Sequence, residues 1–374
     1  MPLLLSILLG LHVYLGWRLL PALAPWPVLQ AGMAVLLLAS WLLMPMPLWA
    51  RRFRSRRLSA AGAWFMGLFS SLLVLTLLRE LLLALAALAG LAWPEAAWRG
   101  AVGDASARAV PPLALALTLW GLWNARRVAA VREVEVPIAG LPQALHGFTI
   151  AQLSDVHVGP TIRRGWLQAV VDRVNTLQAD LVAITGDLVD GTVHELAAHV
   201  APLAALASRH GTYFVTGNHE YYSGAHAWID ELQRLGVRVL MNEHVLLRHG
   251  DAALALAGVA DWSAHHFDAR HRSDPHGAIA GVADAAAVRV LLAHQPRSAI
   301  VAAEAGYHLQ LSGHTHGGQF LPWNWFVRLQ QPFTAGLHRL RDLWVYVSRG
   351  TGYWGPPKRL GAPAEITRLR LVPA

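Results

Sequence analysis

The sequence predicts a helical membrane region followed by an α/β domain, and three observations favour this fold class. Long apolar stretches fill the first third of the chain, at residues 2–22, 27–50, 58–94 and 109–125. From about residue 132 the chain changes to short apolar runs that glycine, aspartate or histidine interrupt. Amphipathic segments separate these runs, as in alternating strands and helices. We therefore expect a transmembrane helical domain at 1–128 and an α/β domain at 129–374.

The composition supports a lipid environment for the first of these domains. Apolar residues make up 55% of the chain and charged residues only 14%, whereas about 25% of an average soluble domain is charged. The formal net charge of +8 does not indicate nucleic-acid binding, because the arginines are not spread as a surface that reads bases or follows phosphates would need, and several of them flank the apolar stretches. The chain has no cysteine, so that disulfides and thiolate metal sites are excluded and any metal must be bound by nitrogen and oxygen.

Four membrane spans are expected, one in each apolar stretch. The first two are close to the about 20 residues that cross a bilayer, and the first lacks the features of a cleaved signal peptide. The third is interrupted by Arg79 and Glu80, which we interpret as a helix end at the headgroups rather than a functional charge pair inside the bilayer. The fourth is short and ends in tryptophan and arginine, as an interfacial anchor does.

Arginine bias predicts the orientation of these spans. The segment RRFRSRR at residues 51–57 is expected to stay in the cytoplasm, because positive loops are retained there. With four spans, Arg126, Arg127 and the α/β domain would then also lie in the cytoplasm, at the inner membrane. Three or five spans would place the domain outside.

Eight apolar runs are expected to form strands: FTIAQL, LVAIT, TYFVT, LALAGV, VRVLLA, YHLQLS, LWVYVS and ITRLRLV. Helices are expected at residues 164–178, 194–208 and 224–235, where apolar residues recur at helical spacing. The polar, histidine-rich stretch 261–279 is expected to be a loop, either plain or a lid over a site.

Metal-binding residue types follow five of these strands. They occur in SDVH, TGDL, TGNHE, LLAHQ and SGHTH, and comprise Asp155, His157, Asp187, Asn218, His294, His314 and His316. In a layered α/β sheet the side chains beyond the carboxyl ends of the strands converge. Two carboxylates, one amide and four imidazoles are too many for one ion and suit two. Two divalent metals are the usual means of displacement at phosphorus. Polar residues at ordinary turns would not recur behind five strands in this order.

These ordered motifs resemble the calcineurin-like metallophosphoesterase superfamily over residues 145–374, and HGGQFLPW, PFTAGLHR and VSRGTGYWGPPKRLGAPAEITRLRL resemble its bacterial membrane-associated branch. The resemblance implies a two-sheet α/β sandwich with a dimetal site at one edge. It implies that Asp155, His157 and His316 bind the first metal, that Asn218, His294 and His314 bind the second, and that Asp187 bridges them. Manganese is implied by the resemblance, with iron or zinc as alternatives. A hydroxide shared by the metals would attack phosphorus.

Residues around this ligand set have expected roles with open alternatives. His219 is the candidate to orient the phosphate or protonate the leaving oxygen, or is a turn residue without a role. Glu220 is expected either to orient a neighbouring histidine or to be exposed. Arg349 is the candidate for substrate binding as a phosphate clamp, or is a surface arginine. Trp323, Trp325 and Phe326 are expected to face an acyl chain or the membrane, or simply to pack.

The predicted function is a membrane-anchored phosphoesterase that cleaves phosphodiester or pyrophosphate bonds. A lipid-linked substrate such as UDP-diacylglucosamine is expected, because the spans would hold the site near the bilayer and because the resemblance includes some relatives in this branch that act on it. A soluble substrate such as a cyclic nucleotide is the alternative. A scaffold of this fold that binds without turnover is a third hypothesis, but such scaffolds lose ligands, and every ligand position is filled here. A transporter function has little support, because the spans lack interrupted helix pairs.

Overall fold

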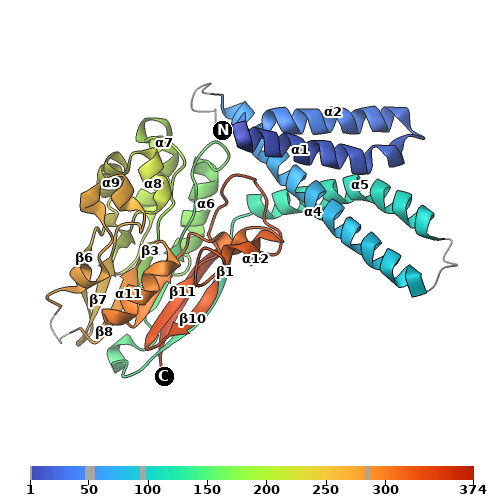
Figure 1. Cartoon of the computed structure of the whole chain (residues 1–374). Helices are drawn as coiled ribbons and strands as arrows, with labels where there is room; N and C mark the ends of the chain where they lie inside the picture. The colour runs from blue at the N-terminus through green and yellow to red at the C-terminus, as the bar shows by residue number, and fades with distance from the viewer. Residues whose placement is uncertain (1, 47–54, 93–97, 283–285) are drawn as a thin grey trace. The chain divides into compact units, whose positions relative to one another are not determined.

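The computed structural model describes residues 2–46, 55–92, 98–282 and 286–374. The chain forms two compact units (Figure 1), one of Met1–Trp123 with Gly355–Lys358 and one of Asn124–Trp354 with Arg359–Ala374. The sequence did not predict that Gly355–Lys358 belong to the first unit. Within that unit, the Lys358 Nζ donates a hydrogen bond to the Gly67 carbonyl at 3.2 Å. A domain boundary at residues 128 and 129 stays a prediction.

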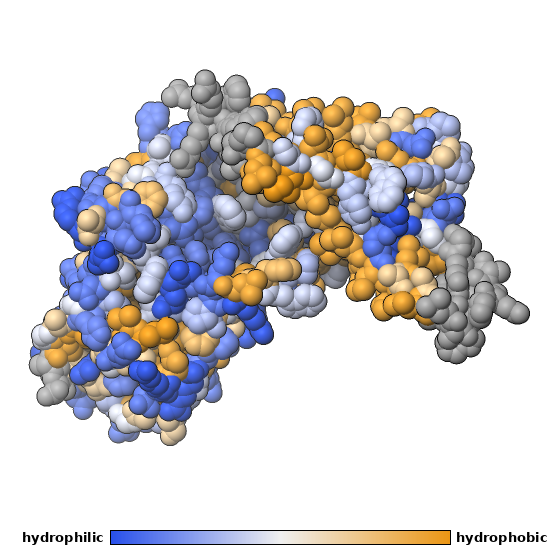
Figure 2. Space-filling view, in the orientation of Figure 1, coloured by the Kyte–Doolittle hydropathy of each residue, from blue (hydrophilic) through white to orange (hydrophobic). Residues whose placement is uncertain are grey.

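The first unit consists of apolar helices: α1 (Pro2–Leu19), α2 (Pro27–Leu43), α4 (Arg56–Ala92) and α5 (Trp98–Arg126). Three segments are long and apolar enough to cross a membrane: Leu3–Leu23, Arg57–Leu88 and Val102–Arg126. Helix α2 is shorter, at 17 residues, and it ends just before Pro45, which has no N–H to continue the helix. Three to four candidate spans are therefore present. Figure 2 shows apolar side chains over the surface of these helices.

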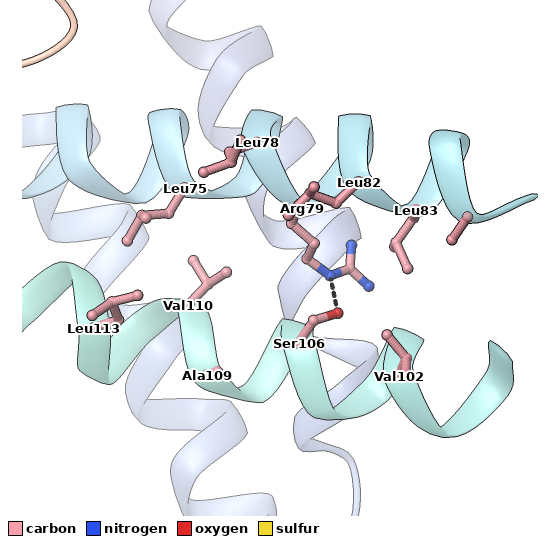
Figure 3. A pocket seen from close by; sticks show the side chains of 11 residues that line it. Leu75, Leu78, Arg79, Leu82, Leu83, Val102, Ser106, Ala109, Val110 and Leu113 are labelled. Atoms are coloured by element: carbon pink, nitrogen blue, oxygen red, sulfur yellow. Dashed lines mark hydrogen bonds between the residues drawn. The ribbon is translucent and has the colours of Figure 1, made fainter. Parts of the chain in front are cut away.

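The prediction that Arg79 and Glu80 mark a helix end is wrong, because both lie inside α4. Glu80 pairs with two arginines: Arg18 Nε donates to its carboxylate at 2.9 Å and Arg79 donates at 2.5 Å. Arg79 also donates to Ser106 Oγ of α5 at 3.0 Å, beside an apolar cavity of about 270 Å³ between α4 and α5 (Figure 3). These partners satisfy the charges, which explains why the helix continues through them. Arg51, Arg52 and Arg54, part of the orientation argument, lie outside the described residues.

The second unit contains two mixed six-stranded sheets. The first sheet has the order β1 (Ala130–Ile138), β12 (Glu365–Pro373), β2 (Thr149–Leu153), β3 (Leu181–Ile184), β4 (Thr212–Phe214) and β5 (Arg238–Val239). The second has the order β10 (Gly336–Leu340), β11 (Leu343–Val347), β9 (Leu309–Ser312), β8 (Val288–Leu292), β7 (Ala252–Gly258) and β6 (Glu243–His249). Strands β2, β3 and β4 run parallel, as do β7, β8 and β9.

The two sheets pack face to face, and helices cover their outer faces. Alternation along β2 shows this: Ile150 packs against the second sheet, whereas Ala151 and Leu153 pack beneath helices. The outer face of the first sheet is covered by α6 (Arg164–Asn175), α7 (Val193–Val200) and α9 (Ala225–Arg234). The outer face of the second sheet is covered by α10 (Pro275–Ile279) and α11 (Ala299–Glu304). The predicted two-sheet α/β sandwich, preceded by apolar helices, is confirmed.

All eight predicted strand runs are strands, but the sequence prediction missed β1, β5, β6 and β10. Helix α7 ends at Val200 rather than residue 208, because Pro202 follows and the chain continues as a short 3₁₀ turn. The predicted loop 261–279 contains short helical turns and α10. These differences do not change the position of the ligand-bearing turns.

Candidate metal centre

The structure brings all seven predicted metal-binding residues to one edge of the sandwich. Asp155 and His157 follow β2, Asp187 follows β3, and Asn218 begins α8 (Asn218–Ser223) after β4. From the second sheet, His294 follows β8, and His314 and His316 follow β9. The carboxyl ends of these strands therefore meet, as the α/β rule predicts.

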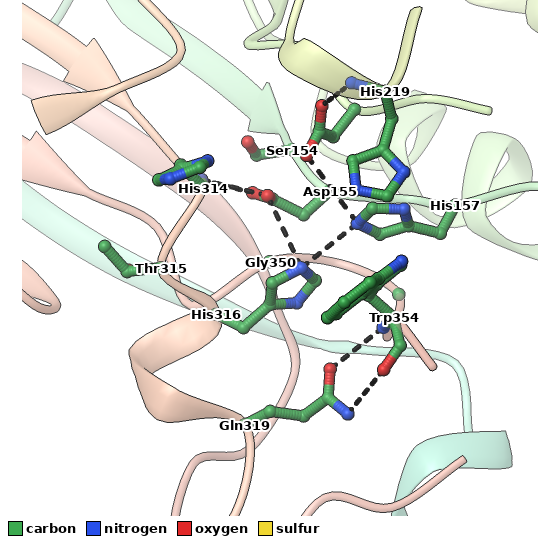
Figure 4. Close-up of polar contacts among 12 residues, drawn as sticks. Ser154, Asp155, His157, His219, His314, Thr315, His316, Gln319, Gly350 and Trp354 are labelled. Atoms are coloured by element: carbon green, nitrogen blue, oxygen red, sulfur yellow. Dashed lines mark hydrogen bonds and ion pairs between the residues drawn. The ribbon is translucent and has the colours of Figure 1, made fainter. Parts of the chain in front are cut away.

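The donor atoms form two groups. In the first, His157 Nε2 lies 3.1 Å from His316 Nε2, and the latter lies 3.6 Å from an Asp155 oxygen (Figure 4). In the second, His294 Nε2 lies 3.2 Å from His314 Nδ1. Imidazole nitrogens facing one another at such distances are suited to a shared cation.

Asp187 lies between the two groups. Its Oδ2 is 3.2 Å from His294 Nε2 of the second group and 4.0 Å from His157 Nε2 of the first. Asp187 is buried, with 3% of its surface exposed. A carboxylate has enough lone pairs to serve two cations, so this position suits a bridging ligand.

Hydrogen bonds set the tautomers of two of these histidines. His157 Nδ1 lies 3.0 Å from the Asp190 carboxylate, and His294 Nδ1 lies 2.7 Å from the Thr185 carbonyl. Both partners are acceptors, so each histidine keeps its proton on Nδ1. The Nε2 lone pairs are then available to a metal, which is the usual arrangement of metal-binding histidines.

Asn218 provides an independent test of whether the site fits a metal. Its Oδ1 is buried, and no described residue donates a hydrogen bond to it. Buried carbonyl oxygens without a partner are costly and require an explanation. A cation would supply the missing partner, and the mixture of imidazole, amide and carboxylate donors suits divalent transition metals.

The backbone is unusual at the ligands themselves. Positive φ angles occur at non-glycine ligand residues: Asp155 (52°), His157 (55°), Asp187 (52°), His314 (70°) and His316 (52°). This region costs on the order of 1–3 kcal/mol per residue and clusters at functional sites. The turns are therefore shaped to direct these side chains rather than to give the most stable backbone.

Comparison with known proteins agrees with this geometry. The profile of the calcineurin-like phosphoesterase family matches residues 148–318. An uncharacterized metallophosphoesterase of Helicobacter pylori is 36% identical over 267 residues, which cover 70% of this chain and 69% of that protein. The chain belongs to the calcineurin-like phosphoesterase family. The superfamily resemblance is thereby confirmed.

Two other relatives show how far this similarity reaches. A transmembrane protein with metallophosphoesterase domain from Bos taurus is 44% identical over 270 residues, or 69% of this chain. The corresponding protein of Danio rerio is 38% identical over 266 residues, also 69% of this chain. The chain spans only 60% and 61% of the length of these two relatives. Members of the calcineurin-like phosphoesterase family use divalent metal ions, which the donor set accommodates.

Glycines allow the ligand loops of this phosphoesterase domain to approach one another. A Cβ on Gly313 would overlap Ser154 Oγ and the Asp155 carboxylate. We therefore expect Gly313→Ala to displace Asp155 and to lose at least half of the bound metal, as determined by elemental analysis of the purified protein. Gly165→Ala is the matched control, since its Cβ would meet nothing within 4 Å. Equal metal content in the two variants would contradict the packing argument.

Glu220 has neither of its predicted roles, because it is fully buried and its carboxylate contacts backbone rather than a histidine. It accepts hydrogen bonds from the N–H groups of Gly217 at 2.7 Å, Leu188 at 2.8 Å, Asp187 at 3.0 Å and Val189 at 3.3 Å. Glu220 thus ties the loop that carries Asp187 to the loop that carries Asn218.

Asp190 was missed by the sequence analysis. One of its carboxylate oxygens lies 3.0 Å from His157 Nδ1 and 2.7 Å from His219 Nδ1. Burial raises the pKa of Asp190, but the two histidines outweigh burial and hold that pKa below its usual value. Its place three residues after Asp187 on the same loop was the available signal.

His219 lies beside the cluster. Its backbone N–H donates to Asp187 Oδ1 at 2.9 Å, and its ring contacts Asp190. Burial lowers the pKa of His219, but the carboxylates of Asp187 and Asp190 outweigh burial and raise the pKa to about 9. A protonated imidazole at neutral pH is the form that a general acid requires.

Arg349 has a carboxylate partner, because its guanidinium donates to the buried Glu365 at 2.9 Å. It also lines a cavity of about 230 Å³ together with Arg328 and Trp325.

The buried Arg359, which sequence analysis missed, donates to the His316 carbonyl at 3.0 Å and the Arg349 carbonyl at 2.7 Å. It therefore stabilises the backbone beside a predicted ligand.

The three aromatic residues after the ligand loop lie on α12 (Trp323–Val327). Trp323, Trp325 and Phe326 are all exposed, although the rings of Trp323 and Phe326 contact each other with centroids 5.7 Å apart. The helix is short and buries none of its residues. Contact with an acyl chain or membrane stays a prediction.

Proposed function

We propose that this chain is a membrane-anchored hydrolase of phosphodiester or pyrophosphate bonds that depends on two divalent metal ions. The observation that supports this most is the pair of donor groups with Asp187 between them. Asp155, His157 and His316 would hold one metal. Asn218, His294 and His314 would hold the other, and Asp187 would contact both.

The metals would lower the pKa of a water molecule and stabilise charge on the phosphate oxygens. Manganese is the proposed metal by family resemblance, with iron or zinc as alternatives, because imidazole and oxygen donors serve all three. Asp190 and Thr185 would keep the Nδ1 protons of His157 and His294 in place.

His219 is the proposed general acid. Asp190 holds its Nδ1, so that the Nε2 proton remains to be donated to the leaving oxygen. Arg349 is proposed to bind a phosphate oxygen in its polar cavity. A guanidinium has five N–H donors, and the pair with Glu365 uses only part of them.

The substrate is proposed to be lipid-linked, such as UDP-diacylglucosamine, with the phosphoesterase domain on the cytoplasmic side of an inner membrane. The candidate spans and the exposed aromatic residues of α12 support this class. A soluble phosphodiester such as a cyclic nucleotide is the alternative, in which the helices serve only for attachment. The filled ligand set argues against a non-catalytic scaffold.

An assay of the full chain in detergent tests the proposal. The protein is stripped of metal, reconstituted with Mn²⁺ and offered a soluble diester, a monoester and a UDP-linked glycolipid. We expect metal-dependent hydrolysis, and at least a hundredfold loss in Asn218→Ala and His316→Ala, because each removes a proposed ligand.

The exposed His194 supplies the control variant, His194→Ala, which should retain full activity. If Asn218→Ala and His316→Ala were as active as His194→Ala, the metal assignment would be wrong. Preference for the glycolipid over the soluble diester would support the lipid-linked substrate, and the reverse would favour the alternative.

A further inference from the structure

Three exposed aromatic residues form a strip beside the metal centre: Trp354, Tyr222 and Phe267, which we call the aromatic strip. Their exposed fractions are 54%, 46% and 53%. The His219 ring contacts two of them, with its centroid 5.6 Å from that of Trp354 and 5.3 Å from that of Tyr222. The ring centroid of Tyr222 in turn lies 5.6 Å from that of Phe267. The strip therefore borders the proposed general acid.

Trp354 is held in this position by its backbone. The Gln319 side chain donates to the Trp354 carbonyl and accepts from the Trp354 N–H, both at 2.9 Å (Figure 4). Gln319 follows the loop that carries His314 and His316, is buried, and has a positive φ of 58°. A buried residue with left-handed backbone thus fixes the main chain that carries an exposed indole to the metal-binding loop. Since burying an aromatic ring is favourable, a ring held exposed beside a reactive site suggests that a ligand covers it.

The position of the strip relates it to the leaving group. A general acid must lie within hydrogen-bond distance of the oxygen that it protonates. The group attached to that oxygen then extends from His219 over its neighbours, which are Trp354 and Tyr222. Flat aromatic surfaces bind planar rings by stacking more favourably than they bind flexible chains, which lose more conformational freedom.

We propose that the aromatic strip binds a planar ring in the leaving group, so that the site favours phosphoesters whose leaving alcohol carries an aromatic ring or nucleobase. This inference rests on the proposed function. It assigns Trp354 as the main contact and Gln319 as its positioning residue. If Trp354 instead contacts bilayer headgroups, the experiment below gives a different result.

The test compares two methyl phosphodiesters with similar leaving alcohols, benzyl alcohol and cyclohexylmethanol, which differ in the planarity of the ring. The full chain with Mn²⁺ in detergent should show a KM for the benzyl ester about tenfold lower than for the cyclohexylmethyl ester, since stacking one ring changes affinity on this order. Trp354→Ala should raise the benzyl KM about tenfold and leave the cyclohexylmethyl reaction unchanged. Trp354→Phe should keep most of the preference.

Two further variants complete the test. Gln319→Ala should raise the benzyl KM without changing kcat for the cyclohexylmethyl ester, because it releases Trp354 without touching the reacting atoms. Trp262→Ala, an exposed tryptophan outside the strip, should change neither ester.

The inference is overturned if the parent shows no preference or if Trp354→Ala slows both esters equally. It is also overturned if Trp354→Ala affects activity only in lipid nanodiscs, which would indicate contact with the bilayer. If the parent hydrolyses neither ester with Mn²⁺ nor any phosphoester in the assay above, the proposed function itself fails.

Discussion

Asp187→Asn is expected to lower kcat/KM for a soluble diester by at least about a thousandfold, and to reduce bound metal from two ions towards one. Asp187 is the carboxylate that lies near both donor groups, at 3.2 Å from His294 Nε2 and 4.0 Å from His157 Nε2. An asparagine offers one oxygen, and its NH₂ group cannot bind a cation. Its remaining oxygen would also have to accept the His219 N–H, which Asp187 now binds at 2.9 Å.

The measurement is steady-state hydrolysis together with the metal content of the same preparation. Asp251→Asn is the control, because Asp251 is exposed and the substitution makes the same change of charge. A variant at Asp187 that kept both ions and the activity of Asp251→Asn would show that the two groups do not form one bimetallic centre.

The sandwich could be predicted only in part from the sequence, for a reason that β1 illustrates. Its nine residues include three charged ones and show neither a continuous apolar run nor a regular alternation, and it pairs in parallel with β12, with Ala130 opposite Glu365. Such pairing depends on residues far apart in the chain, so no local pattern reveals it. The buried central strands were recognised, because continuous apolar runs of that length are typical of strands covered on both faces.

The metal centre was predictable at its ligands and much less around them. Imidazoles, carboxylates and an amide behind successive strands are uncommon enough to be recognised as a set. Asp190, Gln319 and Arg359 belong to residue types that occur anywhere on a protein, and only their partners give them a role: His157 and His219, the Trp354 backbone, and the His316 carbonyl.

Glycine is the residue that adopts left-handed backbone without strain. The structure also places it at ligands such as Asp155 and His314. The surrounding hydrogen bonds hold these turns. The His314 N–H, for instance, donates to Asp155 at 2.9 Å. Tertiary contacts of this kind override local preference, and local sequence does not contain them.

Glu220→Ala is expected to lower the free energy of unfolding of the phosphoesterase domain by about 3 kcal/mol or more, because buried N–H groups without an acceptor cost about 1–3 kcal/mol each. Four N–H groups, from Asp187, Leu188, Val189 and Gly217, depend on this carboxylate. Thermal unfolding followed by near-ultraviolet circular dichroism in detergent should show a lower midpoint, and metal content should fall because two ligand loops lose their connection.

Glu220→Gln distinguishes two contributions to stability. It removes one of the two acceptor oxygens but keeps a buried side chain of nearly the same shape at this position. One oxygen of Glu220 accepts from Leu188 and Val189 and the other from Asp187 and Gly217. Glutamine can serve one of these pairs but presents an NH₂ donor to the other, so its midpoint should lie well below that of the parent although its shape is nearly unchanged. Glu304→Ala, at an exposed position, should leave the midpoint within about 1 °C of the parent. If Glu220→Gln matched the parent instead, the carboxylate would not be what orders the Asp187 and Asn218 loops, and packing alone would have to explain the left-handed turn at Asp187.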